Sequence, residues 1–271
     1  MRATFSFFRL IQLVRKQWFE NARLYLFSVL ALLGILGIAL IILIKNSNNN
    51  YTEDSLYIIF TVGLFIFGSK FASLSFNMLG EKEKGTYWLG LPASHLEKLL
   101  CTIFYNFIVF TLVYCTCSFI LDKLVVTYIQ NLVAINPLKY HYRNIYWTYK
   151  NGYKDVLPFA IYTFFAVQAF YLLGSVYFAR FSFVLTTVVG ATLIGAFIWF
   201  CFYFLTKQML PKYYIWNGTY IYHILFDNKI EISTRYQLSG TLVDILSFIV
   251  RFIWAPVFWI AAWYRLKEKE I

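Results

Sequence analysis

Six apolar runs, each about as long as a lipid bilayer is thick, constrain this chain more than any other feature of its sequence. A helix needs about 20 apolar residues to cross the hydrocarbon core, and a segment alone in lipid must satisfy its own backbone hydrogen bonds. We therefore expect an all-α, polytopic membrane protein with about six transmembrane helices, forming a single domain over residues 1–271. The six runs are Leu24–Ile44, Leu56–Leu79, Leu99–Leu121, Val156–Phe178, Phe183–Leu205 and Leu242–Tyr264.

Composition agrees with this fold class. Only 14% of the residues are charged and 60% are hydrophobic, whereas soluble domains carry about 25% charged residues. The formal net charge is +11, and the basic residues lie mostly in tails and links between the apolar runs. That distribution favours membrane lipids as partners over nucleic acid.

The N-terminal segment, residues 1–23, has one cationic face. Arg2, Arg9, Lys16 and Arg23 recur every seven residues, and only Arg15 departs from the pattern. We expect an amphipathic interfacial helix that lies along the membrane surface as an elbow before the first span. The alternative is a basic tail that only sets the topology. The apolar face comprises Phe7, Phe8, Leu10, Ile11, Val14, Trp18 and Phe19.

Lysine and arginine counts suggest the orientation. With the N-terminus inside, the inner segments hold 12 of these residues and the outer links hold 10. The dense basic cluster before the first span favours a cytoplasmic N-terminus. Six spans then place both termini in the cytoplasm of a cell membrane, and we expect a bacterial inner membrane.

Catalytic and cofactor motifs are absent from the sequence. It contains no phosphate-binding G-x-x-x-x-G-K-[ST], no zinc-binding H-E-x-x-H and no nucleophile turn G-x-S-x-G. The four cysteines lie inside apolar runs without metal-ligand spacing. We expect no catalytic residue, no metal site and no cofactor in this chain, and hence no enzyme activity of its own.

Three ionisable residues fall inside the predicted spans: Lys70, Asp244 and Arg251. Lys70 lies nine residues from the inner end of its run, which is about 14 Å along a helix. Charge at such depth usually faces a protein interior or an aqueous cavity. We expect a polar patch in a transport path or between subunits, and the alternative is an internal ion pair or snorkelling toward the interface.

The link between the second and third runs, residues 80–98, is the most informative stretch. Charged residues open it, Gly85 and Gly90 interrupt it, and Pro92 ends its first part. Ser94 and Glu97 then form a capping box at the start of a new helix. The sequence thus predicts a short, rigid protrusion that displays Tyr87 and Trp88, although an ordinary solvated loop is the alternative.

This link resembles the inner link of type-2 ABC exporter permeases, through E-x-x-x-G-T followed by L-P-A-S-x-x-E-K. The residues that carry the resemblance are Glu81, Lys82, Glu83, Lys84, Gly85, Thr86, Pro92, Ser94, Glu97 and Lys98. In that family the link forms a coupling helix that docks on an ATPase. The resemblance therefore implies an ATPase contact made by Glu81, Glu83, Lys84, Gly85, Thr86, Tyr87, Trp88, Pro92, Ser94, Glu97 and Lys98.

What the resemblance implies is the permease subunit of an ATP-driven exporter. Two such subunits, alike or different, would pair with two copies of a separate ATPase, which alone would bind ATP. The specific match covers about 18 residues, while the layout of elbow and six spans covers the chain. The link from Asp122 to Asp155 is longer than the family leads us to expect. Two alternatives are an intramembrane enzyme acting on lipid or peptide, and a membrane scaffold or accessory subunit.

Overall fold

The protein is an all-α polytopic membrane protein. The computed structural model describes residues 5–47, 49–143, 156–178, 180–204, 214–217, 220–227, 230–237, 245 and 248–269. Within them, five helical stretches are long and apolar enough to cross a membrane. They are α1 (Phe7–Asn46), α2 (Glu53–Leu74), the continuous stretch α4 (His95–Ile103), η2 (Phe104–Val109, π-helical) and α5 (Phe110–Ile135), then α7 (Val156–Tyr177) and α8 (Ser182–Phe204).

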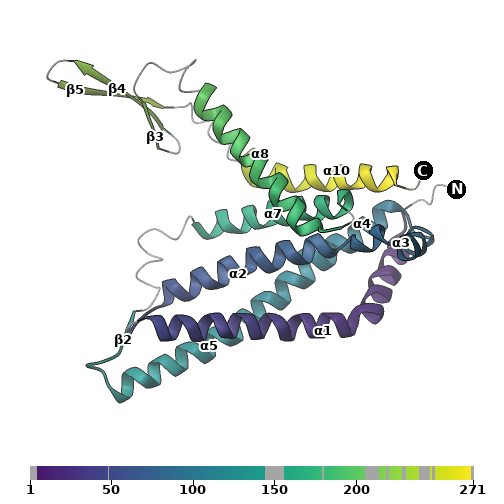
Figure 1. The fold of residues 1–271 in the computed structure, drawn as a ribbon, viewed down its shortest axis with the longest axis horizontal. Helices are drawn as coiled ribbons and strands as arrows, with labels where there is room; N and C mark the ends of the chain where they lie inside the picture. The colour runs from purple at the N-terminus through teal and green to yellow at the C-terminus, as the bar shows by residue number, and fades with distance from the viewer. Residues whose placement is uncertain are drawn as a thin grey trace. The chain divides into compact units, whose positions relative to one another are not determined.

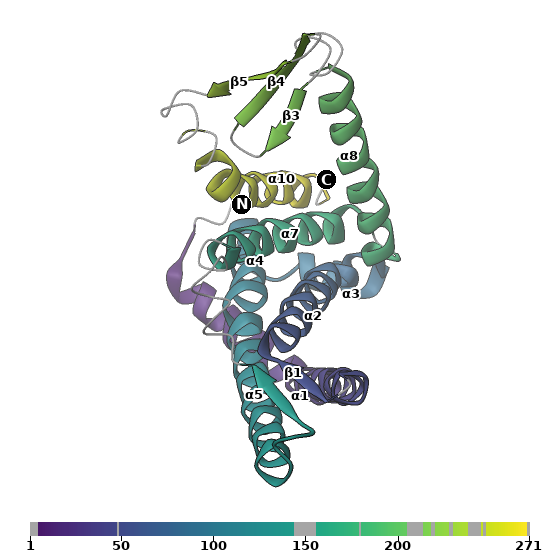
Figure 2. The same cartoon turned by 90° about the vertical axis from the view of Figure 1, so that its left-hand side faces the viewer.

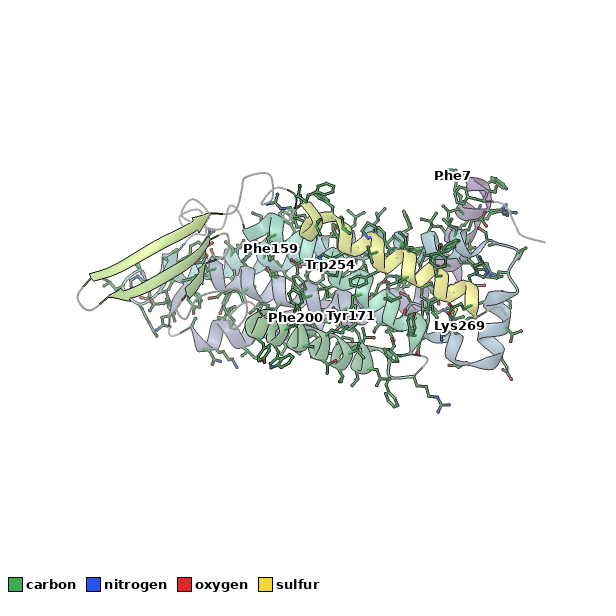
Figure 3. The ribbon with its side chains drawn as sticks, turned by 90° about the horizontal axis from the view of Figure 1, so that it is seen from above. Phe7, Phe159, Tyr171, Phe200, Trp254 and Lys269 are labelled. Atoms are coloured by element: carbon green, nitrogen blue, oxygen red, sulfur yellow. The ribbon has the colours of Figure 1, made fainter. Side chains whose placement is uncertain are left out.

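The sixth predicted run is described in part. From Phe248 onward the chain is helical, through the π-helical η5 (Ile249–Ile253) into α10 (Trp254–Glu268). The start of the run, including Asp244, lies outside the described residues. Large apolar side chains stand outward from the helices, as Phe7 and Phe159 do in Figure 3. Such exposure suits a lipid environment, because hydrocarbon solvates apolar side chains without cost.

Helix α1 joins the predicted elbow and the predicted first span in one helix of 40 residues. The boundary expected at Arg23 is therefore not a helix end. Figure 1 shows that the N-terminal part of α1 nevertheless turns away from the axis of the rest. Its apolar side chains, among them Phe8, Ile11 and Phe19, are exposed. The amphipathic helix is confirmed, and its position along a membrane surface stays a prediction.

The far end of α1 is tied to the far end of α5 by backbone pairing. Strands β1 (Asn50–Thr52) and β2 (His141–Arg143) are parallel, with Asn50 opposite His141. Asn49, with a φ of 67°, accepts a 2.9 Å hydrogen bond from the backbone N–H of His141. Asparagine tolerates this left-handed conformation better than most residues. Helix α5 itself continues to Ile135, well past the predicted end of the third span at Leu121.

Helix α2 lies between α1 and α7 (Figures 1 and 2). Its small residues face α7 in the same chain. A Cβ atom added to Gly68 would lie 2.6 Å from the ring of Phe164, and both Ala72 and Ser73 are fully buried. Small side chains allow two helices in lipid to approach closely. The small-residue spacing on α2 therefore serves packing within this chain.

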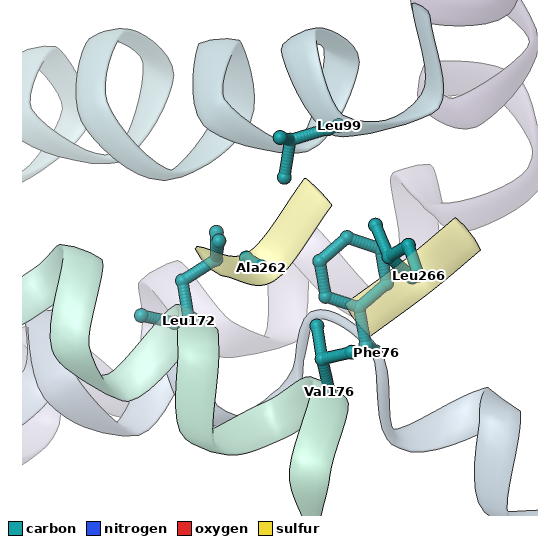
Figure 4. Close-up of a cluster of buried hydrophobic side chains, with 7 residues drawn as sticks. Phe76, Leu99, Leu172, Val176, Ala262 and Leu266 are labelled. Atoms are coloured by element: carbon teal, nitrogen blue, oxygen red, sulfur yellow. The ribbon is translucent and has the colours of Figure 1, made fainter. Parts of the chain in front are cut away.

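Two clusters of buried side chains hold the helices α1, α2, α4, α5, α7 and α10 together. One cluster joins α2, α4, α7 and α10, and Figure 4 shows its side chains converging. Its members are Ala72, Phe76, Leu99, Leu172, Val176, Ala262 and Leu266. The other cluster joins α1, α5 and α7, and Phe65, Phe67 and Phe71 of α2 pack against it. Its buried members are Leu32, Leu36, Phe110, Tyr114, Cys117 and Phe164.

The chain divides into two compact units, residues 1–183 with 255–271, and residues 184–254. The second unit holds most of α8 and an antiparallel three-stranded sheet in the order β3 (Tyr214–Asn217), β4 (Tyr220–Asp227), β5 (Ile230–Gln237). The expected all-α fold included no strand in this part of the chain. Aromatic and β-branched residues favour strands, so the sequences of β3, β4 and β5 did carry a signal for strands. The single permease domain over residues 1–271 stays a prediction.

Candidate functional site: the α3–α4 link and the N-terminal helix

The predicted coupling segment folds into ordered short helices. After α2 comes a single 3₁₀ turn, η1 (Asn77–Gly80), and then α3 (Lys82–Leu89), which ends at Gly90. Helix α4 begins after Ser94. The Ser94 hydroxyl accepts a 3.2 Å hydrogen bond from the backbone N–H of Glu97, and the Glu97 carboxylate accepts one of 2.7 Å from the backbone N–H of Ser94. The predicted capping box is confirmed.

The Glu97 carboxylate also binds the start of α1, a role that sequence analysis missed. Its Oε1 atom accepts hydrogen bonds from the backbone N–H of Ser6 at 2.6 Å and from Nε and Nη2 of Arg9 at 3.3 and 3.1 Å. The Glu97 side chain is fully buried, while that of Arg9 is 34% exposed. Because four donors meet one carboxylate, this buried charge is well compensated. We call Ser6, Arg9, Ser94 and Glu97 the Glu97 clamp.

Further contacts extend the clamp along α1. The Lys16 ammonium donates a 2.8 Å hydrogen bond to the Tyr87 hydroxyl and lies 4.8 Å from the centre of its ring. The Tyr105 hydroxyl donates to the carbonyl oxygen of Val14 at 2.7 Å, and the Cys101 thiol donates to the Gln17 side-chain oxygen at 3.1 Å. The N-terminal part of α1 is thus joined to α3, α4 and η2, and we expect these elements to move together.

Tyr87 and Trp88, paired as exposed aromatics in the sequence analysis, occupy different environments. Tyr87 is 59% exposed on α3. Trp88 packs edge-on against Phe76 with ring centres 5.4 Å apart, and the Lys98 ammonium lies 5.1 Å from the Trp88 ring. Trp88 therefore attaches α3 to the core cluster of Figure 4. Its predicted display at the surface is wrong, because the core beside Phe76 offers it a better apolar environment than water.

The remaining predicted contact residues likewise divide into buried and exposed side chains. Gly85, Glu97 and Lys98 are buried, so they support the link and cannot form its outer surface. Ser94 is half-buried in its cap. The side chain of Lys84 lies outside the described part of the chain. Of the predicted contact residues, Glu81, Glu83, Thr86, Tyr87 and Pro92 are exposed.

The described residues do not test the predicted intramembrane patch of Lys70, Asp244 and Arg251. Helix α2 ends at Leu74, so Lys70 lies four residues from the helix end, or about 6 Å rather than 14 Å. Arg251 is exposed on η5 in the second unit, and Asp244 lies outside the described residues. A shared patch and the depth of Lys70 in the membrane therefore stay predictions, although Lys70 lies closer to the end of its helix than to the end of its apolar run.

Lys70 instead lines a cavity of about 660 Å³ between α1, α2 and the η2–α5 stretch. Its ammonium lies 5.1 Å from the centre of the Phe183 ring. Among the described residues, no group of three or more His, Cys, Asp or Glu side chains could hold a metal ion.

Comparisons with protein-family models, with curated proteins and with solved structures find no match for this chain.

Proposed function

We propose that this protein is the permease subunit of an ATP-binding-cassette exporter. The observation that carries the proposal is the helical α3–α4 link, with its capping box and its attachment to α1. An ATPase on the cytoplasmic side can move the permease helices only through a rigid contact segment, because a flexible loop would absorb the motion. The capping box stiffens the start of α4, and the Glu97 clamp passes its movement to the helix that leads into the first span.

The partners follow from this role. A separate ATPase would bind ATP and contact the exposed face formed by Glu81, Glu83, Thr86, Tyr87 and Pro92. A second permease subunit, identical or different, would complete the transport path. No residue of this chain would be catalytic. The protein would lie in a bacterial inner membrane with both termini in the cytoplasm.

Site-specific crosslinking tests the ATPase contact. A photoreactive amino acid at Thr86, introduced in the full-length protein in its native membrane, should form an adduct with a protein that mass spectrometry identifies as carrying an ATP-binding cassette. The matched control is the same probe at Leu138, which is 97% exposed beyond the other end of α5. No cassette protein should be captured there. Equal capture at both positions, or none at Thr86, would refute the proposal.

Charge reversal sharpens the same test. Glu81→Lys with Glu83→Lys should abolish both the Thr86 crosslink and the co-purifying ATP hydrolysis, since charged pairs set the fit across an interface. The control is Glu268→Lys, an exposed acidic residue on α10. A charge-reversed protein that retains full ATPase association would exclude this surface as the docking site.

Cysteine labelling tests the orientation separately. In a background without native cysteines, single cysteines at Asn49 and Asn151 should react with an impermeant reagent from outside the cell. Cysteines at Lys84 and Glu268 should react only after the membrane is opened. Labelling of position 84 from outside would overturn the orientation and the ATPase contact together.

A further inference from the structure

The cavity beside Lys70 is an apolar groove with aromatic walls. Its lining comes from α1, α2, η2 and α5. Tyr25 stacks on Tyr105 with ring centres 5.6 Å apart, and Phe71 stacks on Phe110 at 5.4 Å. Val29 and other aliphatic side chains continue the wall toward the middle of α1. We call this cavity the α1–α2–α5 groove.

The polar atoms along the groove are mostly engaged within the protein. The Tyr25 hydroxyl accepts a 3.2 Å hydrogen bond from the Gln17 amide, and the Tyr105 hydroxyl donates to the carbonyl oxygen of Val14. The Ser28 hydroxyl donates to the carbonyl oxygen of Leu24 at 2.8 Å. The groove therefore offers a ligand few polar contacts other than its two cationic side chains.

Those two cations are Arg23 and Lys70, and both are exposed. Within the part of the chain that the structure describes, neither forms an ion pair with a carboxylate. The Lys70 ammonium contacts only the face of the Phe183 ring in that part of the chain, and this contact leaves its N–H donors available for an anion. Two cations at an apolar groove are electrostatically complementary to a ligand with an anionic head and an apolar tail.

From Arg23 toward the middle of α1, the groove runs for about the depth of one leaflet of a bilayer. Arg23 and Leu32 both line it and are nine residues apart on α1, which is about 14 Å along the helix axis. The hydrocarbon core of a bilayer is about 30 Å thick, so one leaflet contributes about half of it. Lys70 lies near the end of α2, at the level where lipid head groups are expected.

We propose that the α1–α2–α5 groove binds one anionic phospholipid of the adjacent leaflet. The phosphate lies between Arg23 and Lys70, and one acyl chain runs along Val29, Leu32 and Val113. This site goes beyond the proposed transport function and does not depend on it.

Photoactivatable lipids test the site. The full-length protein is placed in phosphatidylcholine nanodiscs that contain a small, equal fraction of phosphatidylglycerol or phosphatidylcholine, each with a diazirine on the acyl chain. Phosphatidylglycerol should label peptides containing Val29, Leu32 or Val113 well above phosphatidylcholine. Each cation near an anionic lipid contributes about fivefold. Arg23→Gln should thus lower labelling by about fivefold, and the double variant with Lys70→Gln should reach the phosphatidylcholine level.

Two matched variants keep the result interpretable. Arg15→Gln removes an exposed cation of the same helix that does not line the groove, and it should leave labelling unchanged. Val29→Trp fills the groove without altering charge and should lower labelling by both lipids. If the double variant aggregates on size-exclusion chromatography, the Val29→Trp variant tests the groove in its place: unchanged labelling would then exclude lipid binding there.

Three outcomes would overturn the proposal. They are equal labelling by the two lipids, full labelling of the folded double variant, and labels spread evenly over all exposed apolar faces. The last outcome would indicate an annular lipid belt only.

Discussion

The charged side chains of the Glu97 clamp and of the α1–α2–α5 groove differ in burial and in hydrogen bonding, although both lie in one helix bundle. In the clamp, a fully buried carboxylate accepts hydrogen bonds from two backbone N–H groups and from Arg9. In the groove, Arg23 and Lys70 are exposed, and neither has a carboxylate partner among the described residues.

This difference separates charges that build the fold from charges that are free to bind. A buried charge without hydrogen bonds costs several kcal/mol, so it persists only where donors surround it. An exposed cation carries little such cost, and it can contact a lipid head group or a substrate. We therefore expect substitutions in the clamp to change stability most, and substitutions in the groove to change function while stability stays nearly constant.

The largest effect should come from Glu97→Gln. This change removes the negative charge and turns an amide group toward donors from Ser6, Arg9 or Ser94. Loss of the charge weakens all four hydrogen bonds to this carboxylate, and each charge-assisted bond contributes about 1.5–3 kcal/mol. We expect a lower unfolding temperature in detergent, together with faster amide hydrogen exchange over residues 5–16.

The control for the clamp is Glu20→Gln. The Glu20 carboxylate lies 3.7 Å from Lys16 on the surface of α1, and exposed pairs of this kind contribute about 1 kcal/mol or less. If both variants unfold at the same temperature as the unmodified protein, the Glu97 clamp does not hold α1 in place.

The next effect should come from Trp88→Ala, compared with Tyr87→Ala. Truncation of a packed aromatic side chain costs about 3 kcal/mol or more, and Trp88 packs on Phe76 beside the buried Lys98. Tyr87→Ala loses an exposed contact with Lys16 and should cost about 1 kcal/mol. Limited proteolysis of the α3–α4 link measures both. Equal sensitivity of the two variants would mean that Trp88 does not anchor α3.

A smaller effect is expected from Ser94→Ala. Loss of a helix cap typically costs about 1 kcal/mol, because one backbone N–H at the start of α4 loses its acceptor. The double variant with Glu97→Gln should be less destabilised than the sum of the single variants, since the two side chains share the capping box. Chemical denaturation of all three proteins tests this coupling, and strict additivity would argue against it.

The smallest change in stability should come from Lys70→Met. The contact between its ammonium and Phe183 is worth about 0.5–1 kcal/mol at an exposed site, so folding and membrane insertion should remain. Transport, measured as ATP hydrolysis and substrate movement by the reconstituted complex, should fall. Unchanged transport at normal expression would exclude Lys70 from a transport path.

The capped helix could be predicted because it depends on residues that are close in sequence. Ser94 and Glu97 are three positions apart, and their reciprocal hydrogen bonds involve only the first turn of α4. The pairing of Glu97 with Arg9 spans 88 residues, and no local pattern shows it. The regular spacing of Arg9 with Lys16 did indicate a common face, which contacts α3 and α4 through Tyr87 and Glu97.

Which residues of the α3–α4 link are exposed and which are buried likewise could be learned only from the tertiary structure. Tyr87 and Trp88 are adjacent aromatic residues near the end of a short helix, and their sequence context does not distinguish them. Trp88 is directed to the core because Phe76 and Leu99 bring α2 and α4 together beside it. The end of α2 at Leu74 also changed the expected distance of Lys70 from the end of its helix, since the apolar run continues past the point where the helix stops.

The sequence alone determined that this protein crosses a membrane, and where most of its helices lie. Each span in lipid must close its own backbone hydrogen bonds, so length and apolar composition suffice to predict it. Only the tertiary structure decided which charges are buried and which remain exposed. Those outcomes depend on how helices distant in sequence pack side by side. The Glu97 clamp and the groove beside Lys70 exist only because α1, α2, α4 and α5 meet.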